Sequence, residues 1–273
     1  MSTVSLGGAP PARIIGRKKY GTWVAGLVVA GLVALLLGSA FTNRNFSWPA
    51  FGHYVFSPSI LLGLGHTLEL AVLSMALSIV AGVGLAMMRQ SANRVLTTVA
   101  GAYIWVFRAT PLLVLLLLLY NLAALYPKLF TLDTNSVVTV AGAAIIGLTL
   151  HEAAYCAEIF RAGLISVGRG QREAAEALGM PGVLALRRIV LPQAMRAIVP
   201  PLTNQFVNVV KTTSIVSVIA MPELLYSAQI IYARTYETIP LLLVVTFWYL
   251  VVTALLTVVQ RRVERHFDRG ELR

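Results

Sequence analysis

Ionisable side chains recur within an otherwise apolar segment that reads HEAAYCAEIFR from His151 to Arg161. In a helix, His151, Tyr155 and Glu158 would share one face, and Glu152 would lie on an adjacent face. A carboxylate in apolar surroundings can bind an ammonium or guanidinium group, or it can form a buried structural hydrogen bond. Both roles stay open for Glu152. Glu158 can pair with Arg161 three residues later.

A second polar group, Lys211 to Ser214, interrupts another apolar segment. Lys211 can neutralise the carboxylate of a substrate, or it can pair with an acidic residue of a neighbouring helix. The hydroxyl groups of Thr213 and Ser214 can bond to carbonyls of their own helix or face a polar path. These three side chains are therefore candidates for a route through a membrane.

Two further charges lie near the ends of apolar segments. Glu69 can meet an incoming ammonium group, or it can cap or pair within the protein. Arg108 can bind a carboxylate or a lipid phosphate, and a gating role is the alternative. We group Arg108 with Glu158 and Arg161 as a cytoplasmic gate or pairing site.

No pattern in the sequence predicts catalysis. The four histidines are scattered, and neither HExxH nor GxSxG occurs. The single cysteine, Cys156, excludes an internal disulfide, and no metal site is predicted. The chain has no Gly-Lys dipeptide and so no phosphate-binding loop of the GxxxxGK[ST] kind. We therefore assign no enzymatic activity to this chain and expect no cofactor on it.

The elements that must position these residues are membrane helices. Of the 273 residues, 58% are hydrophobic and 12% are charged, and the mean hydropathy is +0.78. The sequence predicts an all-α integral membrane protein with six transmembrane helices. Their expected ranges are 20–41, 60–88, 103–125, 137–160, 202–224 and 239–260.

The formal charge of +11 is spread unevenly along the chain. Basic residues concentrate in the tail 1–19, in alternate connections and in the tail 261–273. The positive-inside rule then places both termini in the cytoplasm. The basic residues flank apolar spans, so we expect membrane lipids and no nucleic acid as partners. A cleaved signal peptide is the alternative interpretation of the first span.

A polar connection, residues 163–201, follows the fourth span on the predicted cytoplasmic side. It should form two short helices separated by a sharp turn at Gly179, and Pro200-Pro201 should start the next membrane helix. Such a segment can dock on a partner protein. The alternative is an amphipathic connector whose arginines hold anionic lipid.

The spacing within this connection resembles the EAA loop of ABC importer permeases. The matching positions are Glu173, Ala174, Ala175, Gly179, Ile189, Leu191 and Pro192. Further segments resemble the polar amino acid permease family, namely FRATPLL from Phe107, AYCAEIFRAG from Ala154, LPQA from Leu191 and KTTS from Lys211. Ala109 and Thr212 depart from that family, which often has Gly and Asp there.

This resemblance implies a type I importer permease of the bacterial inner membrane, with a five-helix core over 60–260 and one additional N-terminal helix. It implies that ATP and Mg²⁺ bind to two partner ATPases, which contact the EAA loop. A second permease, identical or paralogous, and an external solute-binding protein would complete the importer. The expected cargo is a polar amino acid or an opine. A gradient-driven amino acid transporter is the alternative, and a membrane scaffold is a third possibility.

Overall fold

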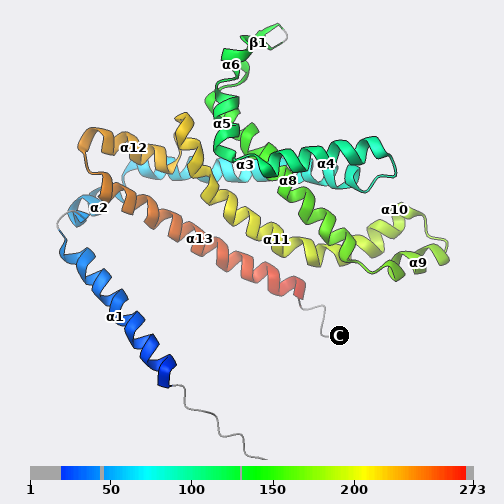
Figure 1. Cartoon of the computed structure of the whole chain (residues 1–273), viewed down its shortest axis with the longest axis horizontal. Coiled ribbons are helices and arrows are strands. Elements are labelled where there is room, and N and C mark those ends of the chain that lie inside the picture. The colour runs from blue at the N-terminus through cyan, green and yellow to red at the C-terminus, as the bar shows by residue number, and fades with distance from the viewer. Residues whose placement is uncertain (1–19, 44–45, 130, 269–273) are drawn as a thin grey trace, which may run out of the picture. The chain divides into compact units, whose positions relative to one another are not determined.

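The computed structural model describes residues 20–43, 46–129 and 131–268. The chain divides into two compact units, Met1–Phe46 and Ser47–Arg273. The described part of the first unit is dominated by α1 (Tyr20–Thr42), a helix whose mid-section is apolar from Trp23 to Leu35 (Figure 1).

The second unit is built almost entirely of helices (Figure 1). Its elements in chain order are α2 (Trp48–Tyr54), α3 (Pro58–Arg89), α4 (Arg94–Ala109), α5 (Leu112–Tyr120), α6 (Leu122–Leu125), β1 (Lys128–Leu129), β2 (Leu132–Asp133), α7 (Thr134–Val137), α8 (Val140–Ser166), α9 (Arg169–Ala177), α10 (Gly182–Ala185), η2 (Leu186–Val190), α11 (Leu191–Thr212), η3 (Thr213–Ile219), α12 (Leu224–Thr235) and α13 (Thr238–Asp268). The strands β1 and β2 form one short antiparallel hairpin.

Three helices of the described chain are long and apolar enough to cross a membrane: 58–89, 140–166 and 238–265. Two pairs of helices joined at a bend, α4 with α5 and the segment 182–219 with α12, raise this number to five if each pair is one span. The all-α membrane architecture predicted from the sequence is therefore present. The count of six spans and their orientation stay predictions.

The core lies where α3, α8 and α11 meet, and small residues let these helices approach closely. Gly82 of α3 faces Cys156 of α8 so tightly that an added Cβ would lie 2.6 Å from the Cys156 Cβ. Gly163 of α8 faces Ile198 of α11 in the same way. Close approach maximises dispersion contacts, which drive helix association where no water is displaced.

The range 103–125, expected as one helix, is divided in the structure. Helix α4 ends at Ala109, and α5 leaves it at an angle of 99°. The cause is Pro111, since the residue before a proline avoids helical backbone angles, and Thr110 has an extended ψ of 126°. The sequence contained this signal, but the continuous apolar run outweighed it in the prediction.

Pro200 and Pro201 do not start a new helix, contrary to expectation. They lie inside α11, which runs from Leu191 to Thr212 and directly continues α10 and η2. Each proline removes one backbone donor but keeps a helical φ. The Thr203 hydroxyl donates to the Pro200 carbonyl at 2.8 Å. Membrane helices tolerate prolines where the surrounding protein satisfies the freed backbone groups.

Candidate functional site

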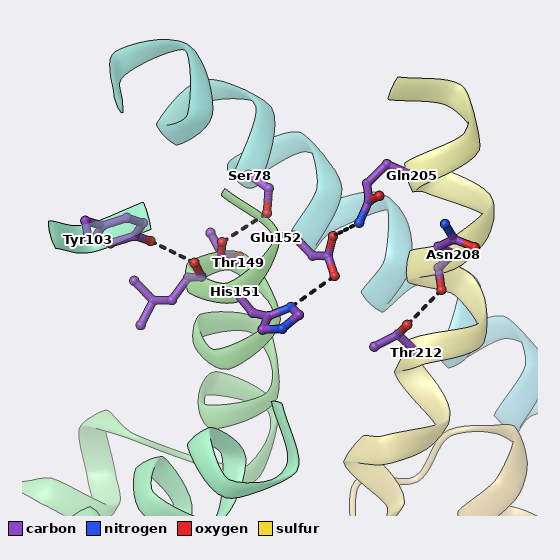
Figure 2. A network of polar contacts seen from close by, with 9 residues as sticks. Ser78, Tyr103, Thr149, His151, Glu152, Gln205, Asn208 and Thr212 are labelled. Carbon is purple, nitrogen blue, oxygen red and sulfur yellow. Dashed lines mark hydrogen bonds and ion pairs between the residues drawn. The ribbon is translucent and has the colours of Figure 1, made fainter. Parts of the chain in front are cut away.

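Glu152 lies near the midpoint of α8, and it is only 2% exposed. Its two carboxylate oxygens have separate partners (Figure 2). Gln205 of α11 donates from Nε2 to Oε2 at 2.6 Å, and His151 Nδ1 lies 3.3 Å from Oε1. At 1.5 Å per residue, the carboxylate is roughly 18 Å from either end of its helix. It is thus a buried acidic group near the middle of a helix that is long and apolar enough to cross a membrane.

Neighbouring helices hold the backbone of α8 just before Glu152 (Figure 2). Ser78 of α3 donates to the Thr149 carbonyl at 3.2 Å, and Tyr103 of α4 donates to the Leu150 carbonyl at 2.9 Å. The Thr149 hydroxyl is itself buried and has no hydrogen-bond partner within the described chain. Together with the Gln205 bond, these two bonds fix the position of the carboxylate relative to α3, α4 and α11. The Thr149 hydroxyl lies about one helical turn away from it.

A polar face continues along α8 toward its C-terminal end. The rings of His151 and Tyr155 lie 5.1 Å apart, and the Arg108 guanidinium lies 5.4 Å from the centre of the Tyr155 ring. Glu158 accepts a bond of 2.8 Å from Arg161, which confirms the pair expected from their spacing. Arg108, Tyr155, Glu158 and Arg161 all line one cavity of about 570 Å³.

The other candidate path residues do not join the Glu152 network. Lys211 is exposed and forms no ion pair within the described residues. Thr213 and Ser214 bond to the Val210 and Lys211 carbonyls of their own helix, at 2.7 and 2.8 Å. Glu69 has a side chain that is 73% exposed, and it lies 3.4 Å from His66. Their shared role in a path stays a prediction.

Sequence reasoning missed two polar residues that the fold places in the interior. Gln205 was not a candidate because an isolated amide in an apolar run carries no periodic signal. Glu223 is fully buried at the start of α12, where it accepts the Tyr226 amide at 2.7 Å and the Tyr249 hydroxyl at 3.1 Å. Thr67 of α3 accepts the adjacent Leu224 amide at 3.1 Å. Glutamate is not a usual N-cap residue, so the sequence carries no clear signal for this role.

The polar connection after α8 forms one short helix, α9, and a turn, as predicted, but the second helical stretch, α10, continues through η2 into α11 and is not a separate short helix. Helix α9 ends with the Gly179 amide bonded to the Glu176 carbonyl and the Met180 amide bonded to the Ala175 carbonyl. These two bonds define a Schellman motif. Gly179 has a φ of +70°, which side chains with a Cβ rarely adopt. The sequence thus terminates α9 by local backbone chemistry.

The residues of the EAA pattern divide into inward and outward sets. Ala175 is fully buried within the chain, whereas Glu173 and Ala174 are exposed. Ile189 is partly buried in η2, a stretch of π-helix, and Leu191 and Pro192 begin α11 on the exposed side. Ala175 therefore packs the loop against its own chain, whereas Glu173 and Ala174 are accessible.

Several large apolar side chains of this loop are exposed. Leu178 and Val183, on either side of the turn, are 79% and 80% exposed. Leu184, Leu186 and Leu191 are each at least 40% exposed. Exposed apolar patches on a short segment mark contact surfaces. We name the outer side chains of Leu178, Val183, Leu184, Leu186 and Leu191 the loop surface.

Comparisons with known proteins give consistent results. An arginine transport system permease protein (ArgU) from Corynebacterium glutamicum is 42% identical over 260 residues, covering 93% of this chain and 82% of that protein. An L-cystine transport system permease protein (TcyB) from Bacillus subtilis is 35% identical, covering 78% of this chain and 88% of that protein. A nopaline transport system permease protein (NocM) from Agrobacterium fabrum is also 35% identical, over 72% of this chain and 82% of that protein.

Solved structures agree with the fold. A crystal structure of an amino acid ABC transporter with histidines has a TM-score of 0.70 at 35% identity, covering 77% of this chain and 95% of that chain. The MetNI methionine ABC transporter in inward-facing conformations has a TM-score of 0.60 at 18% identity, covering 76% and 95%, and so supports the fold alone. Residues 78–269 match the model of one protein family. The chain therefore belongs to the family of binding-protein-dependent transport system inner membrane components.

Proposed function

We propose that this chain is the inner-membrane permease subunit of an ABC importer that takes up a polar amino acid. The loop surface carries the proposal, because an apolar contact patch next to a rigid turn suits docking on a separate ATPase. Family membership and the permeases that resemble the chain support the same conclusion. The chain itself is a non-catalytic transport subunit, and the gradient-driven alternative has no support from these relatives.

The assembly that follows from this function has several chains. Two ATPases would bind ATP and Mg²⁺ and receive the loop surface, and a second permease and a solute-binding protein would complete the importer. Closure of the ATPases would then switch the permease between outward-facing and inward-facing states. The charge distribution supports N-in and C-in termini, with the loop in the cytoplasm.

The substrate class follows from the relatives and from Glu152. The names of the relatives include arginine, glutamine, L-cystine and nopaline, which all carry an ammonium and a carboxylate group or derive from amino acids that do. We propose that Glu152 lines the path with His151 and Tyr155, and that its carboxylate receives a cationic group of the substrate. Lys211, Thr213, Ser214 and Glu69 are proposed to line more distant parts of the path.

Replacement of Gly179 tests the docking role. Gly179→Val should keep the protein in the membrane and abolish stimulation of ATP hydrolysis in reconstituted importers. A β-branched residue at a φ of +70° costs at least about 1–2 kcal/mol, which reorients the turn and the loop surface. No atom lies within 4 Å of an added Cβ there, so backbone strain is the only expected cause.

Gly179→Asn is the matched control, since asparagine tolerates the left-handed region far better than valine does. It should keep most of the stimulation. Normal stimulation in Gly179→Val, with the ATPase co-purifying as in wild type, would remove the loop from the coupling mechanism.

A further inference from the structure

A cavity of about 570 Å³ lies between the C-terminal ends of α3 and α8 and the adjoining helix α4. Its polar lining consists of three arginines, one glutamate and one tyrosine. The lining residues are Arg89, Gly101, Ile104, Trp105, Arg108, Ala109, Tyr155, Glu158 and Arg161. The cavity thus combines a strongly basic wall with an apolar one.

The charges in this cavity are not balanced. Arg161 is neutralised by Glu158, which it contacts through both Nε and Nη2. Arg89 donates to the Thr97 carbonyl at 3.4 Å, and Arg108 stacks on Tyr155. Neither Arg89 nor Arg108 forms an ion pair with a carboxylate among the described residues. Two guanidinium groups therefore face the cavity with uncompensated charge, which calls for an oxyanion.

The cavity extends from the ends of two helices toward the middle of α8. Arg89 is the last residue of α3, and Arg161 is five residues from the end of α8 at Ser166, which is roughly 7.5 Å along the axis. Tyr155, on which Arg108 stacks, lies deeper, roughly 16.5 Å from the same end. Trp105, which lines the cavity, is 72% exposed, as is typical of aromatic side chains at a membrane interface. Gly101 gives the Arg89 guanidinium room to lie against α4, since an added Cβ would be 3.1 Å from Nη1.

We propose that this cavity binds the phosphate headgroup of an anionic phospholipid. The phosphate oxygens accept hydrogen bonds from Arg89 and Arg108, which lie on two different helices. The acyl chains lie against the exposed apolar side chains of α4, namely Val99, Trp105 and Val106, which are 53%, 72% and 43% exposed. A bound lipid then joins the ends of α3, α4 and α8 below the Glu152 network.

Native mass spectrometry of the purified importer tests this proposal directly. The wild-type complex should bind phosphatidylglycerol more tightly than phosphatidylcholine. The double variant Arg89→Gln/Arg108→Gln should lower the phosphatidylglycerol affinity about thirtyfold, because two interfacial arginine contacts are lost. The control Arg94→Gln removes an exposed arginine of α4 that does not line the cavity, and it should leave the affinity unchanged.

A variant that should raise the lipid affinity distinguishes loss of the binding site from a folding defect. Glu158→Gln removes the one carboxylate of the cavity, so it should raise the phosphatidylglycerol affinity. Equal lipid binding by wild type and the double variant would overturn the proposal. So would displacement of the lipid by millimolar arginine or glutamate, which would assign the cavity to the substrate, or by inorganic phosphate, which would indicate a site for a free anion.

Discussion

Glu152 is an acidic residue that is buried in the interior of the protein. Its carboxylate is 2% exposed, and it is held by one amide and one imidazole. No arginine or lysine forms an ion pair with it within the described chain. A buried carboxylate held in this way is costly unless a cation joins it at some stage. A substrate cation would supply that charge, which is the basis of its proposed role.

Replacement of this carboxylate by an amide separates a transport role from a structural one. Glu152→Gln should lower the uptake of arginine in proteoliposomes by at least about tenfold, since a charge-assisted hydrogen bond contributes about 1.5–3 kcal/mol. Asp133→Asn, which changes an exposed carboxylate outside the proposed path, should leave uptake close to wild type. Unchanged uptake with a lowered melting temperature in Glu152→Gln would show that this carboxylate is only structural.

At the scale of elements, α3 and α8 depend on glycine at their contact. The space opposite Gly82 is filled by the Cys156 Cβ and by the Ala157 backbone nitrogen, which an added Cβ would approach to 3.0 Å. Backbone atoms cannot move aside as a flexible side chain can. The separation of α3 and α8 is therefore set at this point, and with it the position of Glu152.

A pair of glycine substitutions in α3 tests this contact. Gly82→Ala should destabilise the protein by about 1–3 kcal/mol, as overpacking of a dense interior does. Gly84→Ala in the same helix meets no atom within 4 Å and should be neutral or slightly stabilising. Thermal unfolding in detergent measures both. If Gly82→Ala melts at the same temperature as Gly84→Ala, the helices are not held at this distance by Gly82.

The bend before α12 is a second element that side chains hold in place. Ala220 ends η3 with a φ of +60°, and Glu223 then caps α12 while accepting the Tyr249 hydroxyl of α13. Gly63 of α3 packs against Ser227 of the same helix α12. Three helices are thus joined at one buried carboxylate. Its loss in Glu223→Ala should lower the melting temperature more than loss of the only partly buried Glu237 in Glu237→Ala.

At the scale of the whole molecule, the division into two units has a consequence for stability. The buried apolar clusters of the described chain lie entirely within the second unit, Ser47–Arg273, which also contains the family match over 78–269. The part of the chain that matches the family therefore lies wholly within the second unit.

Removal of residues 1–46 tests this independence. The remaining protein should insert into the membrane and keep the thermal unfolding transition of the full chain, because the truncation removes none of these buried clusters. Melting curves of both proteins in the same detergent provide the comparison. A clearly lower transition in the truncated protein would show that the first unit contributes to the core.

The sequence by itself determined the helical membrane architecture, the loop with its turn at Gly179, and the Glu158–Arg161 pair. The membrane helices follow from the hydropathy of each segment. The turn and the ion pair follow from backbone geometry within a few residues. Residues close in sequence are therefore sufficient to predict them. The break in the helix at Thr110 was not predicted. The apolar run favoured one continuous helix, whereas Pro111 favoured a break, and the prediction followed the apolar run.

Only the tertiary structure decided which distant polar groups meet. Gln205 reaches Glu152 from 53 positions away, Thr67 meets the start of α12, and Arg89 shares a cavity with Arg108. Such contacts depend on the rotation and separation of packed helices, which small residues such as Gly82 and Gly163 set to within a fraction of an ångström. Periodicity along one helix carries no information about the partner that faces it.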